Sequence, residues 1–167
     1  MTNPIFNARL EGRCEGTCLF QILMGVKEML DFKENELDVS TYLMLRKKVG
    51  WVELSRRQAT MALQNALYTV VVYRDGVPVG MGRVIGDGGV VSYIQDLVVI
   101  PEAQGQKIGS QILNMLSSYV RSITEPGTRM MLCLMCAKGR EEFYLHNGFT
   151  ARPTTNLGPG MITYIQN

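Results

Sequence analysis

The sequence predicts an α/β fold, in which a mixed, mostly antiparallel central sheet is flanked by helices and contains one β-α-β crossover. The hydrophobic period changes from helical to extended near the middle of the chain. Two extended runs, 68–74 and 77–85, are joined by Asp75-Gly76, a strong signal of a hairpin. An amphipathic helix over 107–123 then separates two apolar runs, so the strands on either side of it must be parallel.

The first part of the predicted domain holds one strand and two helices. Residues 27–32 alternate between apolar and polar side chains, which predicts a strand. Residues 39–49 are predicted as a helix whose basic residues near the C-terminus suit the helix dipole. A second helix opens at Ser55, with Gln58 as its capping-box partner.

After the hairpin, a turn at 87–89 leads into a third antiparallel strand over 90–100, which Pro101 ends. The sequence EPGT breaks the long helix that follows. The closing elements are expected to be a strand over 129–136, a short helix within 140–149 ended by a left-handed cap at Asn147-Gly148, and short strands at 150–153 and 161–166.

The global properties limit the kind of protein. We expect an N-terminal extension of uncertain structure over residues 1–26 and a single domain over 27–167. A net charge of +2 makes no case for nucleic acid or an anionic membrane, and no apolar run approaches the ~20 residues of a membrane span. Residues 1–20 lack the long apolar centre of a secretory signal. We therefore expect a cytoplasmic protein without nucleic-acid or membrane partners, and leave a homodimer open.

The four cysteines raise the question of a zinc site. Cys133 and Cys136 have the spacing of a zinc knuckle, and Cys14 and Cys18 could complete it. Residues three apart on a strand point to opposite faces, so we expect reduced thiols and no metal. The chain's single histidine, His146, excludes a site that needs two imidazoles.

The turn between the third strand and the long helix is a candidate anion site. The first backbone N–H groups of a helix lack intrahelical partners, and the helix dipole makes them attractive to phosphate. Gly105 would let the backbone approach a ligand closely, and Gly109 removes side-chain bulk one turn later. A plain structural turn is the alternative, because the glycines match neither the dinucleotide fingerprint nor the P-loop.

Three segments carry a family resemblance that covers roughly residues 27–166. DLVVIPEAQGQKIGSQIL (96–113) resembles the acetyl-coenzyme A signature of the GCN5-related N-acetyltransferases (GNAT). EEFYLHNGF (141–149) resembles the second marker of that family. RPTTNLGPGM (152–161) is similar to a small bacterial subgroup that includes relatives of plant-type arylalkylamine acetyltransferases.

The resemblance implies acetyl-coenzyme A as co-substrate and an amine as acceptor. The third strand and the crossover strand would splay apart, so that the pantetheine arm pairs with a free backbone edge. Lys107 stands where the family usually has glycine; we expect it to take ordinary helical angles and to modify binding rather than abolish it. The pantetheine edge would be Leu97, Val98 and Val99, and the pyrophosphate would be held by N–H groups of Gln104, Gly105, Gln106, Lys107, Ile108, Gly109 and Ser110.

The resemblance also implies catalytic roles. Tyr144 occupies the general-acid position, although it could simply pack with Phe143. Asp96 interrupts an apolar run and is the candidate base or amine anchor. Alternatively Asp96 is only hydrogen-bonded to neighbouring loops, and a water relay from backbone groups replaces a dedicated base.

The acceptor pocket is expected to use Trp51, Arg83, Tyr93 and Met161, although Trp51 could equally be a core anchor. The expected function is transfer of an acetyl group from acetyl-coenzyme A to a primary amine on a small molecule, with a protein or peptide N-terminus as another acceptor. A non-catalytic module that binds coenzyme A is the alternative from a different class.

Overall fold

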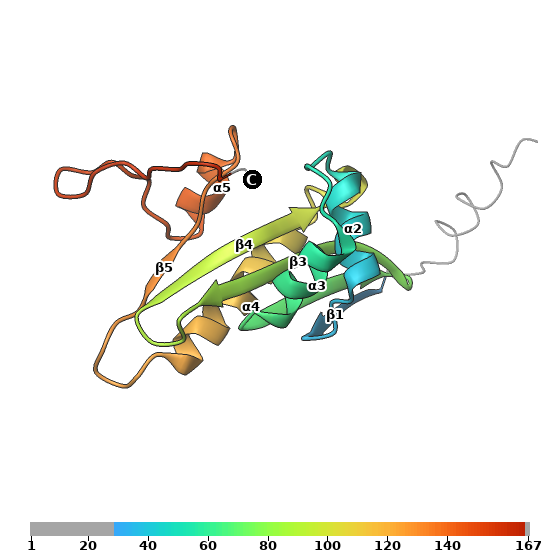
Figure 1. The fold of residues 1–167 in the computed structure, drawn as a ribbon, viewed down its shortest axis with the longest axis horizontal. Coiled ribbons are helices and arrows are strands. Elements are labelled where there is room, and N and C mark those ends of the chain that lie inside the picture. The colour runs from blue at the N-terminus through green and yellow to red at the C-terminus, as the bar shows by residue number, and fades with distance from the viewer. Residues whose placement is uncertain (1–28, 166–167) are drawn as a thin grey trace, which may run out of the picture.

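A five-stranded sheet in the order β1-β2-β3-β4-β5 organises the computed structural model, which describes residues 29–165 (Figure 1). Helices α2 and α3 lie against one face, and α4 covers the other. The elements are β1 (Leu30–Glu34), α2 (Val39–Lys48), α3 (Arg56–Gln64), β2 (Tyr68–Arg74), β3 (Val77–Gly86), β4 (Val91–Val99), a short 3-10 helix (Pro101–Ala103), α4 (Ile108–Ile123), β5 (Met131–Cys133) and α5 (Glu141–His146).

The sheet has the predicted topology. Strands β1 to β4 form an antiparallel meander, and β5 joins β4 in parallel through the crossover helix α4. This confirms the predicted fold class. Strand β1 begins at Leu30, later than the predicted start at residue 27. The predicted extension over residues 1–26 lies outside the described residues.

Local capping signals fix the starts of α2 and α3. The Asp38 carboxylate accepts hydrogen bonds from the backbone N–H groups of Ser40 (2.8 Å) and Thr41 (3.1 Å) at the start of α2. Ser55 and Gln58 form the predicted reciprocal capping box, at 3.1 and 2.9 Å. These contacts satisfy N–H groups that have no partner within the helix.

Helix α4 approaches β3 closely because two glycines of that strand, Gly80 and Gly82, face it. A Cβ atom added to Gly82 would lie 2.7 Å from Ile112 Cγ2 and 2.9 Å from Leu116 Cδ1, which is too close for real atoms. The apolar stripe predicted for this helix is the one that is buried: Ile108, Ile112, Leu113, Leu116 and Val120, with Tyr119 partly exposed. The core therefore lies between α4 and the middle of the sheet.

The crossover strand is shorter than predicted, and the two predicted closing strands are wrong. The strand expected over 129–136 is only Met131–Cys133, and the described residues of 150–153 and 161–166 form no strand. Strand β5 pairs with β4 only at Val91, Ser92 and Tyr93 and then leaves the sheet toward α5 (Figure 1). An extended segment gains ladder hydrogen bonds only from a neighbour, and this short β5 offers little edge for later strands.

In the part of the chain that the structure describes, no helix has both the length and the hydropathy needed to cross a membrane.

Candidate functional site

Strand β4 contains an irregularity at Asp96. The pairing register of β3 and β4 shifts between Met81 and Arg83, and Asp96 opposite this shift has a φ of 57°. A non-glycine residue in this left-handed region is strained and usually depends on surrounding contacts to hold it there. The side chain of Asp96 is buried, so those contacts come from the side chains packed around it.

Four side chains donate to the Asp96 carboxylate. Oδ1 accepts hydrogen bonds from Arg46 Nη1 at 2.6 Å and from Gln95 Nε2 at 3.2 Å, and Oδ2 accepts from Arg83 Nε at 2.8 Å and from Tyr42 Oη at 2.7 Å. The Arg46 and Arg83 side chains are 13% and 10% exposed. This cluster of Asp96, Arg46, Arg83 and Tyr42, here named the Asp96 cluster, carries one more positive than negative charge.

The Asp96 cluster bears on two predictions. Arg83, which was expected in the acceptor pocket, is hydrogen-bonded within the protein, since its Nη1 also donates to the Ala62 carbonyl on α3 at 2.9 Å. Asp96 is hydrogen-bonded, as the alternative anticipated, but its partners lie on α2, on β3 and on β4 itself rather than on loops. Tyr42 and Arg46 were not predicted as site residues. Their spacing of four residues on one helix places them on the same face, which is the signal that could have found them.

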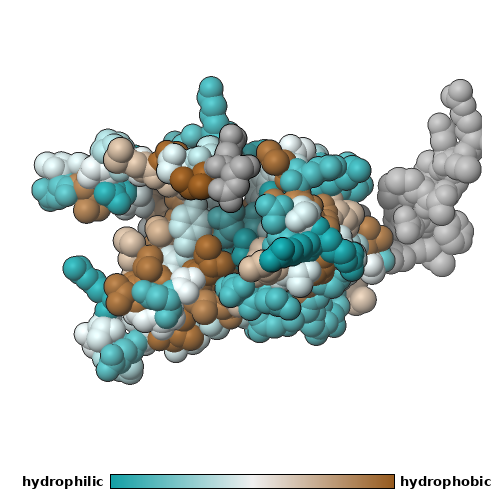
Figure 2. Space-filling view, in the orientation of Figure 1, coloured by the Kyte–Doolittle hydropathy of each residue, from teal (hydrophilic) through white to brown (hydrophobic). Residues whose placement is uncertain are grey.

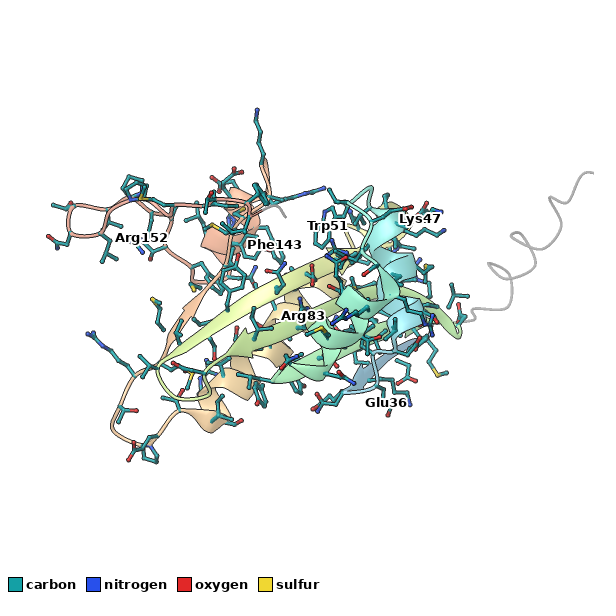
Figure 3. All side chains as sticks on the ribbon, viewed as in Figure 1. Glu36, Lys47, Trp51, Arg83, Phe143 and Arg152 are labelled. Carbon is teal, nitrogen blue, oxygen red and sulfur yellow. The ribbon has the colours of Figure 1, made fainter. Side chains whose placement is uncertain are left out.

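Trp51 covers Arg46 from the loop between α2 and α3. Its ring centroid lies 5.0 Å from the Arg46 guanidinium carbon, in the range of a cation–π contact. Trp51 and Arg83 both lie on the side of the sheet that α2 and α3 cover (Figure 3). Beside Trp51 is a hollow of about 320 Å³ lined by Leu43, Met44, Arg46, Lys47, Trp51, Val52, Glu53 and Leu54.

The divergence of β5 leaves one edge of β4 unpaired. Ile100 N–H donates to the Val79 carbonyl across the β3 ladder, so by alternation the backbone groups of Val99 face the other side. There the Val99 carbonyl accepts a hydrogen bond from Gln104 Nε2 at 2.9 Å. The expected splay between β4 and β5 is therefore present, and the surface is hollowed between the C-terminal segment and the sheet (Figure 2).

Tyr93 lies at the point where the two strands part. It is the last β4 residue paired with β5, and its hydroxyl accepts a hydrogen bond from the Met135 backbone N–H at 2.9 Å. A side chain thus takes up an N–H group that a continued ladder would otherwise use. Burial raises the pKa of the Tyr93 hydroxyl, which remains protonated at neutral pH.

The turn before α4 has the geometry of an anion cradle. Gly105 has a φ of +78°, and α4 begins at Ile108 without a capping side chain among the described residues. Lys107 has a φ of +62°, so the expectation of ordinary helical angles was wrong. The turn needs a left-handed residue there, which explains why a glycine suits this position and why lysine is strained.

Two arginines from distant parts of the chain flank this turn. Arg74 at the end of β2 donates to the Gln106 side-chain oxygen. Arg140 before α5 donates from Nη2 to Gln104 Oε1 at 3.3 Å. With Lys107, they place three positive charges around the free N–H groups of α4, an environment suited to a phosphorylated ligand.

Tyr144 lies on α5, facing the aromatic residues around it. Its ring makes edge contacts with Phe143 and Phe149, at centroid distances of 4.9 and 5.9 Å. Burial, with Cys136 and Tyr93 nearby, raises the pKa of Tyr144 to about 12. Phe143 also reaches toward the cradle, since a Cβ atom on Gly109 would lie 3.5 Å from its ring. Tyr144 is thus packed as the alternative anticipated, and it is also a phenol that holds its proton.

Met161 is not brought to the other acceptor candidates. Its side chain is 89% exposed on the C-terminal segment.

Cys136 is exposed and lies outside β5, so the argument that it and Cys133 occupy opposite faces of one strand was wrong. Within residues 29–165, no group of three or more His, Cys, Asp or Glu residues is placed to hold a metal ion. Cys14 and Cys18 lie outside the described residues, and the absence of a metal stays a prediction.

Comparisons with known proteins agree with this arrangement. Residues 65–151 match the acetyltransferase (GNAT) domain. An N-acetyltransferase of Prochlorococcus marinus, described as uncharacterised and ycf52-like, is 30% identical over 125 residues, which are 72% of this chain and 67% of the relative.

Two solved bacterial structures are similar over most of the chain. A probable acetyltransferase of unknown function from meticillin-resistant Staphylococcus aureus has a TM-score of 0.71 and 32% identity, covering 83% of this chain and 100% of its own. A GNAT family acetyltransferase from Streptococcus pneumoniae has a TM-score of 0.70 and 25% identity with the same coverage. Together with the matched domain, these similarities show that the chain belongs to the GNAT family of acetyltransferases.

Proposed function

We propose that the protein transfers the acetyl group of acetyl-coenzyme A directly to a primary amine on a small molecule. The observation that carries this proposal is the free edge of β4 beside the uncapped start of α4. An extended, amide-containing pantetheine arm needs backbone partners, and a pyrophosphate needs N–H donors with positive charge nearby. Both requirements are met by adjacent parts of one surface.

The cofactor proposal uses the residues expected from the sequence. Leu97, Val98 and Val99 would offer their backbone edge to pantetheine, and the N–H groups of 104–110 would take the pyrophosphate. Gln104 would have to release or share the Val99 carbonyl, which it now occupies. A solved aminoglycoside N-acetyltransferase in complex with coenzyme A has the same fold, with a TM-score of 0.62 at 14% identity, which supports this proposal.

The proposed chemistry needs a proton removed from the amine and one supplied to the sulfur. Alkylamines have a pKa of ~10, so most of the acceptor arrives protonated. The Asp96 carboxylate is already occupied by Arg46, Arg83 and Tyr42. We therefore propose that Asp96 is not the base and acts as the anchor on the amine-binding side of the site. A water relay from backbone groups then removes the proton of the amine.

Tyr144 would donate the second proton, to the departing thiolate. Its pKa of about 12 exceeds the ~8.5 of an ordinary thiol, so the phenol keeps its proton until negative charge develops on sulfur. Trp51 and Tyr93 are proposed to contact the acceptor, with Arg83 beneath them and Met161 reaching the pocket only if the C-terminal segment moves.

An amine panel with thiol detection tests the function. Acetyl-coenzyme A is supplied with aryl-, alkyl- and polyamines and with peptide N-termini, and release of free coenzyme A is followed. Amine-dependent thiol release from a small amine is the expected result. Calorimetric binding of coenzyme A without release for any amine would instead favour the non-catalytic module.

Replacement of Tyr144 by Phe tests the mechanism. The variant keeps the ring packing and loses the proton, so turnover should fall about 10²–10⁴-fold while coenzyme A binding is unchanged. The raised pKa further predicts that Tyr144 causes no loss of activity between pH 7 and about 11, because loss of its proton comes only near 12. Tyr119→Phe is the matched control, because Tyr119 lies on α4 and stacks on Tyr68 rather than on Phe143 or Phe149. Unchanged turnover of Tyr144→Phe, where chemistry limits the rate, would exclude this role.

A further inference from the structure

Arg46 contacts both the candidate acceptor surface and the irregular point of β4. Its Nη1 donates to Asp96 Oδ1 at 2.6 Å, across 50 residues of sequence. The same guanidinium lies over the Trp51 ring, with its carbon 5.0 Å from the ring centroid. Its Nη2 donates to the Val52 carbonyl at 3.2 Å, which ties the loop after α2 to the same group.

The position of this guanidinium is tightly defined although it is not fully hydrogen-bonded. Arg46 Nε is buried and has no hydrogen-bond partner in the part of the chain that the structure describes. An orphaned buried donor is costly, so the remaining contacts must outweigh that cost. Those contacts are the Asp96 ion pair, the Val52 carbonyl and the faces of Trp51 and Tyr42.

The side-chain contacts of Asp96 constrain the backbone of β4. Its φ of 57° is held by side-chain contacts, and the next residues are Leu97, Val98 and Val99. If the Asp96 carboxylate is released, the strained backbone can relax, and the direction of the following edge changes with it. The edge proposed to bind pantetheine therefore has its geometry set partly from α2.

We propose that Arg46 is a positioning residue that links the acceptor surface at Trp51 to the cofactor-binding edge of β4 through Asp96. The link rests on the proposed function, because it needs coenzyme A to bind along β4. Binding of the cofactor alters the backbone around Asp96, and Arg46 conveys that change to Trp51. In the other direction, an acceptor stacked on Trp51 stabilises the edge in its binding geometry.

Trp51 is the only tryptophan of the chain, so its fluorescence reports on this link directly. Coenzyme A and acetyl-coenzyme A are titrated in parallel by calorimetry and by tryptophan emission. We expect the emission of the parent protein to change in step with the binding isotherm. In Arg46→Met, which keeps the aliphatic stem, the emission change should vanish and coenzyme A affinity should fall about tenfold, within the range for residues in contact.

Two further variants keep the test decisive. Arg57→Met removes an exposed arginine of α3 and should retain both the affinity and the emission change. Arg46→Lys keeps a positive charge but cannot reach Asp96 and the Val52 carbonyl together. Arg46→Lys should reduce both the coenzyme A affinity and the emission change, and it replaces Arg46→Met in the test if that variant does not fold.

The outcomes separate this inference from the function beneath it. Calorimetric binding without any emission change in the parent would overturn the link and leave the proposed function standing. A full emission response in the folded Arg46 variants would do the same. Absence of coenzyme A binding in the parent by calorimetry would overturn the proposed function, and the link with it.

Discussion

The two sides of β4 are held in different ways. Toward β3, the ladder extends from Gly80 opposite Val99 to Gly86 opposite Ser92, and buried ion pairs lie against it. Toward β5, only three residue pairs form, and most of the segment after α5 is exposed. A rigid strand and an open edge thus belong to the same element. A site that needs free but well-placed backbone groups is best built at such a boundary.

The largest expected effect is on the rigid side. Asp96→Ala leaves two mostly buried guanidiniums without their carboxylate partner, and loss of one partner of a buried pair costs about 3–5 kcal/mol of unfolding free energy. Asp31→Ala is the control, since Asp31 pairs with Lys33 at 3.3 Å on the surface and its loss should cost less than about 1 kcal/mol. Urea denaturation measures both. Equal costs would mean that the Asp96 cluster contributes no more to stability than a surface pair.

Gly82 on β3 and Gly158 in the C-terminal segment differ in the space around them. Gly82→Ala places a Cβ atom 2.7 Å from Ile112 Cγ2, and overpacking of this kind costs about 1–3 kcal/mol. The same change at Gly158, in the C-terminal segment, meets nothing within 4 Å and should not reduce stability. Thermal unfolding of the two variants measures the difference. A destabilised Gly158→Ala would indicate that the open side is packed in solution.

Lys107→Gly tests the strain at the boundary itself. Removal of Cβ relieves the strain of a left-handed lysine, which raises the free energy of unfolding by about 1–2 kcal/mol. The glycine also makes the unfolded chain more flexible, which lowers the free energy of unfolding by about 0.4–1 kcal/mol. The difference of these ranges gives an expected net gain of about 0–1.6 kcal/mol, with a middle value of about 0.8 kcal/mol. Lys107→Ala removes the charge but keeps Cβ, and so should not gain stability. If both variants gain equally, the charge and not the backbone is the source.

The smallest effect is expected on the open side. Ile162 is 67% exposed, so Ile162→Ser should change the unfolding free energy by no more than about 0.5 kcal/mol. Ile112→Val in the buried stripe of α4 should cost about 0.5–1.5 kcal/mol in the same assay. A larger loss at Ile162 than at Ile112 would reverse the comparison between the two sides.

The accuracy of the sequence-based predictions follows the same division. Features set by residues within one or two turns were confirmed: the capping box at Ser55, the hairpin at Asp75-Gly76 and the buried stripe of α4. The closing strands were wrong, because β-branched and aromatic residues in 161–166 indicate a tendency to extend but cannot supply a partner strand. Cys136 was misplaced for the same reason.

The candidate site divides in a similar way. The splay of β4 and β5 was expected from the family resemblance and is present. The roles of Tyr144 and Asp96 stay proposals, although the structure places one in an aromatic cluster and the other between two arginines. Arg46 was passed over because a basic residue near a helix C-terminus also suits the helix dipole, and its spacing of four residues from Tyr42 was the one local signal of a shared face.

Periodicity, caps and turn residues act over a few positions, so the order and type of most elements and the place of the turn before α4 could be predicted from the sequence. The tertiary structure decided how far β5 follows β4, which backbone angle Lys107 adopts, and which side chains meet Asp96. Arg46 and Asp96 are 50 residues apart, and their contact exists only because α2 packs across β3 and β4. Such contacts depend on the relative placement of whole elements, which local patterns do not encode.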